Sequence, residues 1–83
     1  MRKIIAKVGM FNSMSTVNVV EEEKLLSTVQ IPLEDLVGGI KAAQARFNAD
    51  KIVLAGNKEF LSRYAAELNT NFNNSIEIEI KGV

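Results

Sequence analysis

The chain has 83 residues, of which 47% are apolar, and its 10 Lys and Arg residues balance 10 Asp and Glu residues. This length and composition predict one small folded domain over residues 1–83, without a net charge that would draw the whole chain to nucleic acid or an anionic membrane. The sequence contains no His and no Cys, which excludes imidazole catalysis, thiol chemistry, disulfide bonds and the usual zinc or haem ligands.

The first third of the chain predicts three β-strands in close succession. Residues 3–8 and 15–20 are rich in Ile, Val and Thr, and the turn-forming segment 9–14 separates them. Residues 24–31 form a third apolar run after the acidic triplet 21–23, which we interpret as a solvated turn. Because these connections are too short for helical crossovers, the three strands should form an antiparallel meander.

Pro32 marks a change to helical periodicity. Apolar residues recur every three or four positions from Leu33 to Phe47, and Pro suits the first turn of a helix because it lacks an amide donor that the turn does not need. Gly38 and Gly39 are unexpected in this helix, since each Gly costs about 1 kcal/mol relative to Ala. Gly39 borders the apolar stripe, so we favour a close approach of the helix to its neighbour; a kink is the alternative.

The second half alternates strand, helix and strand. Residues 52–55 are continuously apolar, which is typical of an interior parallel strand. An amphipathic helix follows, with Asn57 as its N-cap and Tyr64 on its buried side. Residues 75–81 alternate Ile with Glu and Lys, as in an edge strand with one solvated face. The element order is therefore β-β-β-α-β-α-β.

This order predicts a mixed α/β fold, a two-layer sandwich of a five-stranded mixed sheet in the order 3-2-1-4-5 with two helices on one face. The third, fourth and fifth strands run parallel, and their helical connections are right-handed in about 98% of known cases. Because both connections cross the sheet in the same direction, both helices must lie on the same side. The alternation of side chains agrees, since one sheet face is apolar and the other is mixed.

The predicted uncovered face retains apolar residues that no third helix can bury. The first turn also contains two Met and one Phe, which either fold back over the core or form a soft contact surface. Because monomers rarely expose large apolar patches, we expect self-association through the open face or an edge strand. The interface candidates are Ile5, Val20, Leu26, Val53, Met10, Phe11 and Met14.

The element order resembles that of the ribonuclease H-like fold, which actin-like and Hsp70-like ATPase domains share in outline. The strand 52–55, Gly56 and the helix from Lys58 look like the strand-glycine-helix unit near the nucleotide of actin-like ATPases. Those proteins usually carry paired glycines at this turn, whereas Asn57 follows Gly56 here. The resemblance implies a module that binds a nucleotide or nucleic acid through its first hairpin and this turn.

The catalytic chemistry of these families is not carried over. Their nucleases need an acidic residue on the first strand, but residues 4–8 contain none and Lys7 would repel a cation. Asp50 precedes the fourth strand, at the end opposite the usual ligand site of parallel strands. The Asp that starts the actin-like phosphate hairpin is also missing; its remaining polar residues would be Gly9, Asn12, Ser13, Ser15 and Thr16. We therefore expect no enzymatic activity, no catalytic residue, no metal and no cofactor.

One weak anion-binding candidate is the start of the second helix. The backbone amides after Gly56, together with Asn57 and Lys58, could hold a phosphate at the helix N-terminus. The glycine-rich loop of true phosphate sites is missing, so we expect a ligand-free cap.

Basic residues of the first strand provide a second charged feature. Arg2, Lys3 and Lys7 could meet nucleic acid from the open face, but Glu77 and Glu79 should lie on that face and reduce the attraction. Cross-strand ion pairs are the simpler interpretation, so we expect no nucleic-acid partner.

These observations favour a small non-enzymatic interaction or assembly protein that is homo-oligomeric and has a protein partner still to be identified. The alternative is a degenerate ribonuclease H-like or actin-like module that binds a nucleotide or nucleic acid. No stretch reaches the roughly 18 apolar residues of a membrane span, so we expect a cytoplasmic protein without a membrane partner. Its small size and lack of catalytic groups suggest a phage or mobile-element accessory protein.

Overall fold

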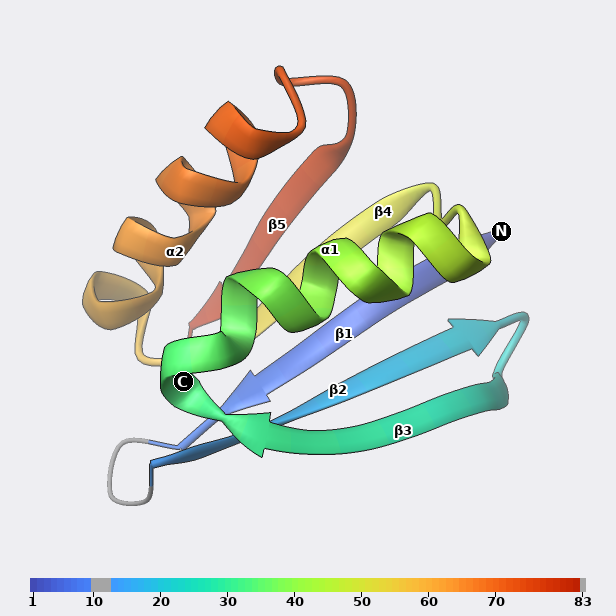
Figure 1. Ribbon diagram of the computed structural model, residues 1–83, viewed down its shortest axis with the longest axis horizontal. Helices are drawn as coiled ribbons and strands as arrows, with labels where there is room; N and C mark the ends of the chain where they lie inside the picture. The colour runs from blue at the N-terminus through green and yellow to red at the C-terminus, as the bar shows by residue number, and fades with distance from the viewer. Residues whose placement is uncertain (10–12, 83) are drawn as a thin grey trace.

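The computed structural model describes residues 1–9 and 13–82. Its strands and helices follow the predicted order (Figure 1). They are β1 (Arg2–Val8), β2 (Met14–Glu21), β3 (Lys24–Pro32), the short 3₁₀ turn η1 (Leu33–Asp35), α1 (Leu36–Phe47), β4 (Lys51–Gly56), α2 (Lys58–Asn71) and β5 (Glu77–Gly82).

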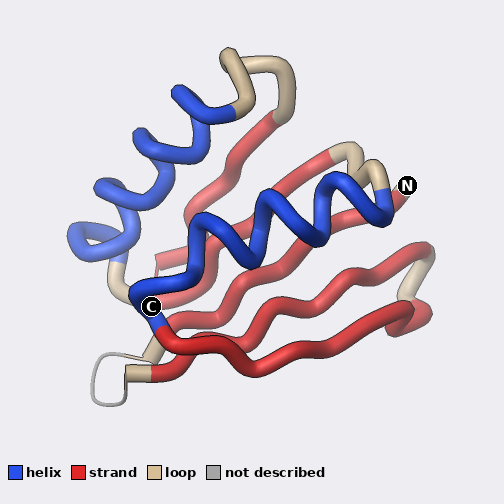
Figure 2. The backbone as a smooth tube through the Cα atoms, in the orientation of Figure 1, coloured by secondary structure: helices blue, strands red, loops and turns tan. Residues whose placement is uncertain are grey.

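The five strands form one mixed sheet in the order β3-β2-β1-β4-β5. β2 pairs antiparallel with both β1 and β3, whereas β4 pairs parallel with both β1 and β5. Both helices lie on the same face of this sheet (Figures 1 and 2). The predicted two-layer α/β fold is therefore confirmed.

The strands differ from the predicted ranges by one or two residues at their ends, and the start of the first helix differs more. Pro32 ends β3 in an extended conformation, with φ −58° and ψ 144°, instead of opening the helix. It remains in the sheet because it pairs with Met14 of β2, and the next amide, from Leu33, donates a hydrogen bond of 2.6 Å to the carbonyl oxygen of Ser13. A 3₁₀ turn then redirects the chain, so α1 begins only at Leu36.

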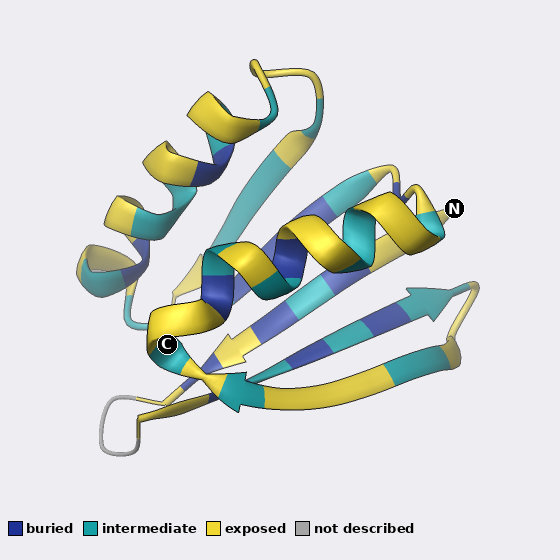
Figure 3. Ribbon diagram, in the orientation of Figure 1, coloured by how far each residue is buried: buried dark blue, intermediate teal, exposed yellow. Residues whose placement is uncertain are grey.

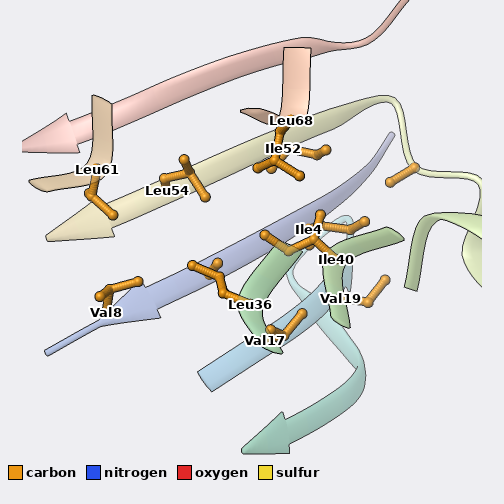
Figure 4. Packing of buried hydrophobic residues seen from close by; sticks show 12 residues of the cluster. Ile4, Val8, Val17, Val19, Leu36, Ile40, Ile52, Leu54, Leu61 and Leu68 are labelled. Carbon is orange, nitrogen blue, oxygen red and sulfur yellow. The ribbon is translucent and has the colours of Figure 1, made fainter. Parts of the chain in front are cut away.

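The core lies between the sheet and the two helices (Figure 3). Leu36 and Ile40 of α1 and Leu61 and Leu68 of α2 are fully buried against the apolar face of β1, β2 and β4 (Figure 4). Tyr64 packs against this core and meets the Phe60 ring edge-to-face, with 5.5 Å between ring centroids. The predicted apolar stripes of both helices are thus the buried ones.

The two glycines of α1 differ in their surroundings. A Cβ on Gly39 would collide with the terminal methyl group of Ile31 in β3, whereas a Cβ on Gly38 would meet nothing within 4 Å. The predicted close approach is confirmed for Gly39, because a side chain there would require the terminal methyl group of Ile31 to move. Packing does not explain Gly38.

Candidate interaction surfaces

The sheet face opposite the helices, called the open face below, is mostly polar. Its members follow from the register, because residues that pair across neighbouring strands share a face. Lys7 pairs with Thr16 and Ala55, and Ile5 pairs with Asn18 and Val53. The remaining members on these alternating positions are Lys3, Met14, Val20, Leu25, Thr28, Gln30, Pro32, Lys51, Glu77, Glu79 and Lys81.

Val53 lies on the open face but is not available for contact. It is only 5% exposed, which corrects its prediction as an interface residue. The side chain of Lys51, two residues earlier on the same face, reaches Glu79, and Glu79 pairs directly with Val53. The aliphatic part of such a lysine covers the apolar surface beneath it. Ile5 and Val20, two other candidates on this face, are half-buried.

Leu26 is also misplaced in the prediction. The pairing of β2 with β3 is regular up to Val19 and Ser27, and then Val20 pairs with Leu25, which leaves Leu26 as the extra residue of a bulge. Leu26 packs against the core on the helix side. Leu25 takes its place on the open face, where it is 55% exposed.

Three further candidates lie in or next to the first hairpin. Met10 and Phe11 are outside the described residues. Met14 is exposed at the start of β2, where it pairs with Pro32. Of the described interface candidates, Ile5 and Val20 are therefore half-buried and Met14 is exposed.

The ion pairs of the open face centre on Lys51, a residue that the sequence analysis did not select. Its Nζ lies 2.5 Å from a carboxylate oxygen of Glu79 and 3.1 Å from one of Glu77. These hydrogen bonds, with Glu79 contributing most, raise the pKa of Lys51, and the hydrogen bond from Lys51 lowers the pKa of Glu79. The register could have found this pair, because Lys51 is directly opposite Glu77.

Arg2 does not share the open face with Lys3 and Lys7, contrary to the prediction. It belongs to the helix side, where its Nε lies 2.6 Å from Glu21 and its Nη1 donates a hydrogen bond of 2.8 Å to the Phe47 carbonyl oxygen. Its amide nitrogen also donates to the side chain of Asp50, at 3.0 Å. Both Arg2 and Asp50 therefore join the start of β1 to the connection between α1 and β4.

A hollow of about 380 Å³, lined by apolar residues such as Val8 and Met14 as well as by polar ones, lies where β1 and β4 end. Lys7, Thr16 and Gln30 contribute side chains to it, and within the part of the chain that the structure describes these side chains make no hydrogen bond or ion pair. Gly56 lines the hollow with a φ of 149°, and a Cβ there would lie 2.7 Å from the Val8 carbonyl oxygen. A glycine is therefore required at this turn.

The other predicted phosphate-site residues are used elsewhere. The Oδ1 of Asn57 accepts a hydrogen bond of 3.0 Å from the amide of Phe60, which confirms the predicted N-cap. Lys58 is exposed beside Gly82 and does not line the hollow. Ser15 is buried, and its hydroxyl donates to the carbonyl oxygen of Ile31 at 3.3 Å. Of the predicted set, Asn12 lies outside the described residues, and among the described members Gly9, Thr16 and Gly56 surround the hollow.

The two edges of the sheet differ in composition. β3 runs for nine residues along one edge, and Lys24 is its only charged residue. β5, at the other edge, has six residues, of which Glu77, Glu79 and Lys81 are charged. Charged side chains and short length protect an edge strand from pairing with another chain; β3 is longer and less charged than β5, and its own protective features are Lys24, the bulge at Leu26 and Pro32, which lie towards its two ends.

An apolar groove of about 280 Å³ accompanies the β3 edge on the helix side. α1 touches β3 at Gly39 but ends near β1, where Arg2 holds Phe47, so the helix leaves most of β3 uncovered (Figure 1). Val29 stands in this groove and is 49% exposed. The groove and the edge strand thus form one continuous surface, called the β3 surface below.

Two classes of site are not found among residues 1–9 and 13–82. No three acidic side chains gather there as a ligand set for a metal ion. Within the same ranges, neither helix combines the length and the apolar character that crossing a bilayer requires.

No family model matches the sequence, and no curated protein is significantly similar to it. Among solved structures, part of Pelota from Archaeoglobus fulgidus is similar, with a TM-score of 0.62 over 99% of this chain and 8% sequence identity. The chain spans 27% of the length of that Pelota chain. At such low identity the likeness concerns the fold alone, and function has to be argued from the surfaces. This chain therefore shares an α/β fold with one part of a larger protein.

Proposed function

We propose that this chain is a non-enzymatic interaction protein that self-associates through the β3 surface. The observation that carries the proposal is the contrast between the two sheet edges. β5 is short and charged, whereas β3 is long, uncovered and nearly free of charge. Between the bulge at Leu26 and Pro32, the edge of β3 presents backbone N–H and C=O groups to another strand, and pairing them supplies affinity.

The groove adds apolar contact area beside these backbone groups. Val29 and Ile31 face it from β3; Ala42, Ala43 and Phe47 line it from α1, together with the charged Arg46. A strand added to β3 would place its own side chains over this groove and remove Val29 from water. Burial of apolar area contributes about 25 cal/mol per Å² to the free energy of association. Backbone hydrogen bonds would orient the added strand, and apolar contacts in the groove would strengthen its binding.

The open face supports self-association less well than the β3 surface. Val53 is already buried, and Lys51, Glu77 and Glu79 satisfy one another's charges. Covering this face would remove water from these charged groups, which costs free energy unless the partner replaces every contact. The sequence analysis expects self-association through either the open face or an edge strand, and we therefore propose the edge strand β3.

The oligomeric state of the purified chain tests this proposal. We expect light scattering and analytical ultracentrifugation to show reversible association between low micromolar and millimolar concentration. Val29→Lys should shift the equilibrium to the monomer, because it places a charge in the groove. Ala66→Lys is the matched control, since Ala66 is exposed on α2, away from β3. A strict monomer at millimolar concentration would refute self-association.

A second candidate function is binding of a phosphate-bearing ligand, such as a nucleotide, in the hollow at the ends of β1 and β4. The observation that favours it is the lining, in which Lys7, Thr16 and Gln30 converge without any acidic residue. The hollow also lies at the carboxyl ends of the parallel strands β1 and β4, where open α/β sheets commonly bind ligands.

A thermal shift assay with ATP, GTP, inorganic phosphate and short oligonucleotides tests this second function. A ligand that binds only the folded chain raises its melting temperature. We expect Lys7→Ala to abolish such a shift and Lys41→Ala, on the exposed side of α1, to preserve it. No shift at millimolar ligand would reject the hollow as a phosphate site.

A further inference from the structure

An open hollow of about 540 Å³ lies between the end of β3 and the first half of α2. Pro32, Leu33 and Glu34 line it from the end of the strand and the turn η1, and Phe60 and Tyr64 line it from α2. Pockets for small ligands commonly have volumes of roughly 300–1,000 Å³, so the hollow is large enough for one. Its walls combine aromatic rings with a carboxylate, and both attract an organic cation.

The aromatic part of the hollow is a corner formed by two rings. Phe60 and Tyr64 lie four residues apart on α2, so their side chains are neighbours on the same side of the helix. Their ring centroids are 5.5 Å apart, and the ring planes are inclined by 69°. A rounded group placed in such a corner touches both rings. The face of an aromatic ring carries negative electrostatic potential, so a cation is attracted there more strongly than a neutral group of the same shape.

The charges around the hollow also favour a cation. Glu34 is exposed at its rim, and within residues 1–9 and 13–82 its carboxylate makes no ion pair or hydrogen bond. No Lys or Arg is among the described residues that line the hollow. The first turn of α2 contains Glu59, whose charge opposes the positive end of the helix dipole beside Phe60. A cation that enters the hollow thus meets an unpaired carboxylate without a competing basic side chain.

We propose that this hollow binds a small quaternary ammonium compound, with its methyl groups in the corner of Phe60 and Tyr64 and its charge beside Glu34. A primary ammonium group is strongly hydrated and has three N–H donors to satisfy. A trimethylammonium group has no N–H donor, and its methyl groups suit the apolar walls formed by Pro32 and Leu33. The proposal does not depend on self-association, and each of the two can fail without the other.

Nuclear magnetic resonance of the full-length chain tests the site, with choline as the probe. Tyr64 is the only Tyr in the sequence, so its ring signals are assigned without ambiguity. We expect millimolar affinity and nuclear Overhauser effects between the methyl protons of choline and the ring protons of Tyr64. The neutral isostere of choline, in which carbon replaces nitrogen, should bind about tenfold more weakly because it lacks the charge.

Single substitutions separate the carboxylate from the rings. Glu34→Gln should weaken choline binding about threefold and leave binding of the neutral isostere unchanged, because it removes only a charge. Phe60→Leu should weaken choline binding more than binding of the isostere, because it removes one ring of the corner. Glu67→Gln is the matched control, since Glu67 is exposed on α2 and does not line the hollow. Circular dichroism checks that each variant is folded.

Three results would overturn the proposal. The first is no binding at high millimolar choline, and the second is equal affinity for choline and its neutral isostere. The third is equal weakening by Glu34→Gln and Glu67→Gln, since only net charge would then matter. Phosphocholine distinguishes a free cation from a lipid headgroup. Its phosphate brings negative charge close to Glu34, so it should bind more weakly than choline, and tighter binding would assign the hollow to a headgroup instead.

Discussion

The side chain of Gln44 hydrogen-bonds to both backbone groups of Ala49. Its Nε2 donates to the Ala49 carbonyl oxygen at 3.0 Å, and its Oε1 accepts from the Ala49 amide at 2.8 Å. Ala49 is buried, so this pair of bonds replaces water for both groups in the connection between α1 and β4. Asn48, between them, adopts the left-handed conformation that ends the helix.

We expect Gln44→Ala to lower the free energy of unfolding by about 1–3 kcal/mol, because two buried backbone groups lose their partners. Urea denaturation monitored by circular dichroism measures the change. Lys41→Ala, three residues earlier in α1 and exposed, should leave stability within about 0.5 kcal/mol of the wild type. Equal stabilities of the two variants would contradict the role given to Gln44.

The two glycines of α1 provide a matched pair. Gly38→Ala should raise the free energy of unfolding by about 1 kcal/mol, because Ala favours the helix and its Cβ meets nothing. Gly39→Ala should raise the free energy of unfolding by less than Gly38→Ala does, or should lower it, since the new Cβ forces the side chain of Ile31 to move. Thermal unfolding of both variants measures the difference. A gain at Gly39 equal to that at Gly38 would show that Ile31 yields without cost.

The turn between β2 and β3 stores backbone strain. Glu22 and Glu23 both have positive φ, at 46° and 69°, a conformation that costs most residues about 1 kcal/mol or more. We expect Glu22→Asn with Glu23→Gly to raise the melting temperature by several degrees, because these residues suit such a hairpin turn. Glu22→Gln with Glu23→Gln removes the same charges without relieving φ and should give no comparable rise.

Asn18 on the open face has a buried Oδ1 without a hydrogen-bond partner among the described residues. Asn18→Val should therefore stabilise the fold by about 1 kcal/mol, since it removes an unpaired polar atom and favours a strand. Thr16→Val, on the same face of β2, is the control for β-propensity on this strand. Chemical denaturation measures the stability of both variants. If Thr16→Val stabilises the fold as much as Asn18→Val does, the unpaired Oδ1 of Asn18 is not the source of the gain.

The Lys51–Glu79 pair makes stability depend on pH at both extremes. The pKa of Glu79 is lowered from 4.5, so its contribution is complete above that value and disappears as pH falls through the lower folded pKa. The pKa of Lys51 is raised from 10.5, so its contribution is complete below that value and disappears as pH rises through the higher folded pKa.

Lys51→Met isolates this contribution, because it keeps an apolar stem over Val53 and removes the charge. We expect the stability difference from the wild type to be constant near neutral pH and to vanish in strong acid. Lys41→Met, which has no carboxylate partner among the described residues, should show no such pH dependence. A difference for Lys51→Met that persists unchanged at low pH would exclude the ion pair as its cause.

The sheet order could be predicted because several local signals agree. Connection lengths required a meander for the first three strands, and the continuous apolar run 52–55 required an interior position. The handedness of the crossovers then placed both helices on one side. Connection lengths and apolar runs involve residues that are close in the sequence, so they can be recognised without knowing the structure.

The surfaces were harder to predict because they depend on register and on long side chains. The bulge at Leu26 exchanged the directions of Leu25 and Leu26, and alternation alone does not reveal a bulge. Val53 is buried although it lies on the open face, and the ion pair of Lys51 with Glu79, directly opposite Val53, depends on the register of β4 with β5. The charge contrast between the edge strands, however, was present in their sequences.

The bulge at Leu26 also determines where β3 can change in length during evolution. Loss of one residue anywhere from Ser27 to Ile31 would shift the register of part of the strand by one residue. The apolar side chains of that part would then point away from the core, to the opposite face of the sheet. Loss of Leu26 itself would leave Leu25 opposite Val20 and Ser27 opposite Val19, as they are now. Relatives that lack one residue here would therefore keep the same pairing of β2 with β3, and deletions at this position should be the ones that natural variation tolerates.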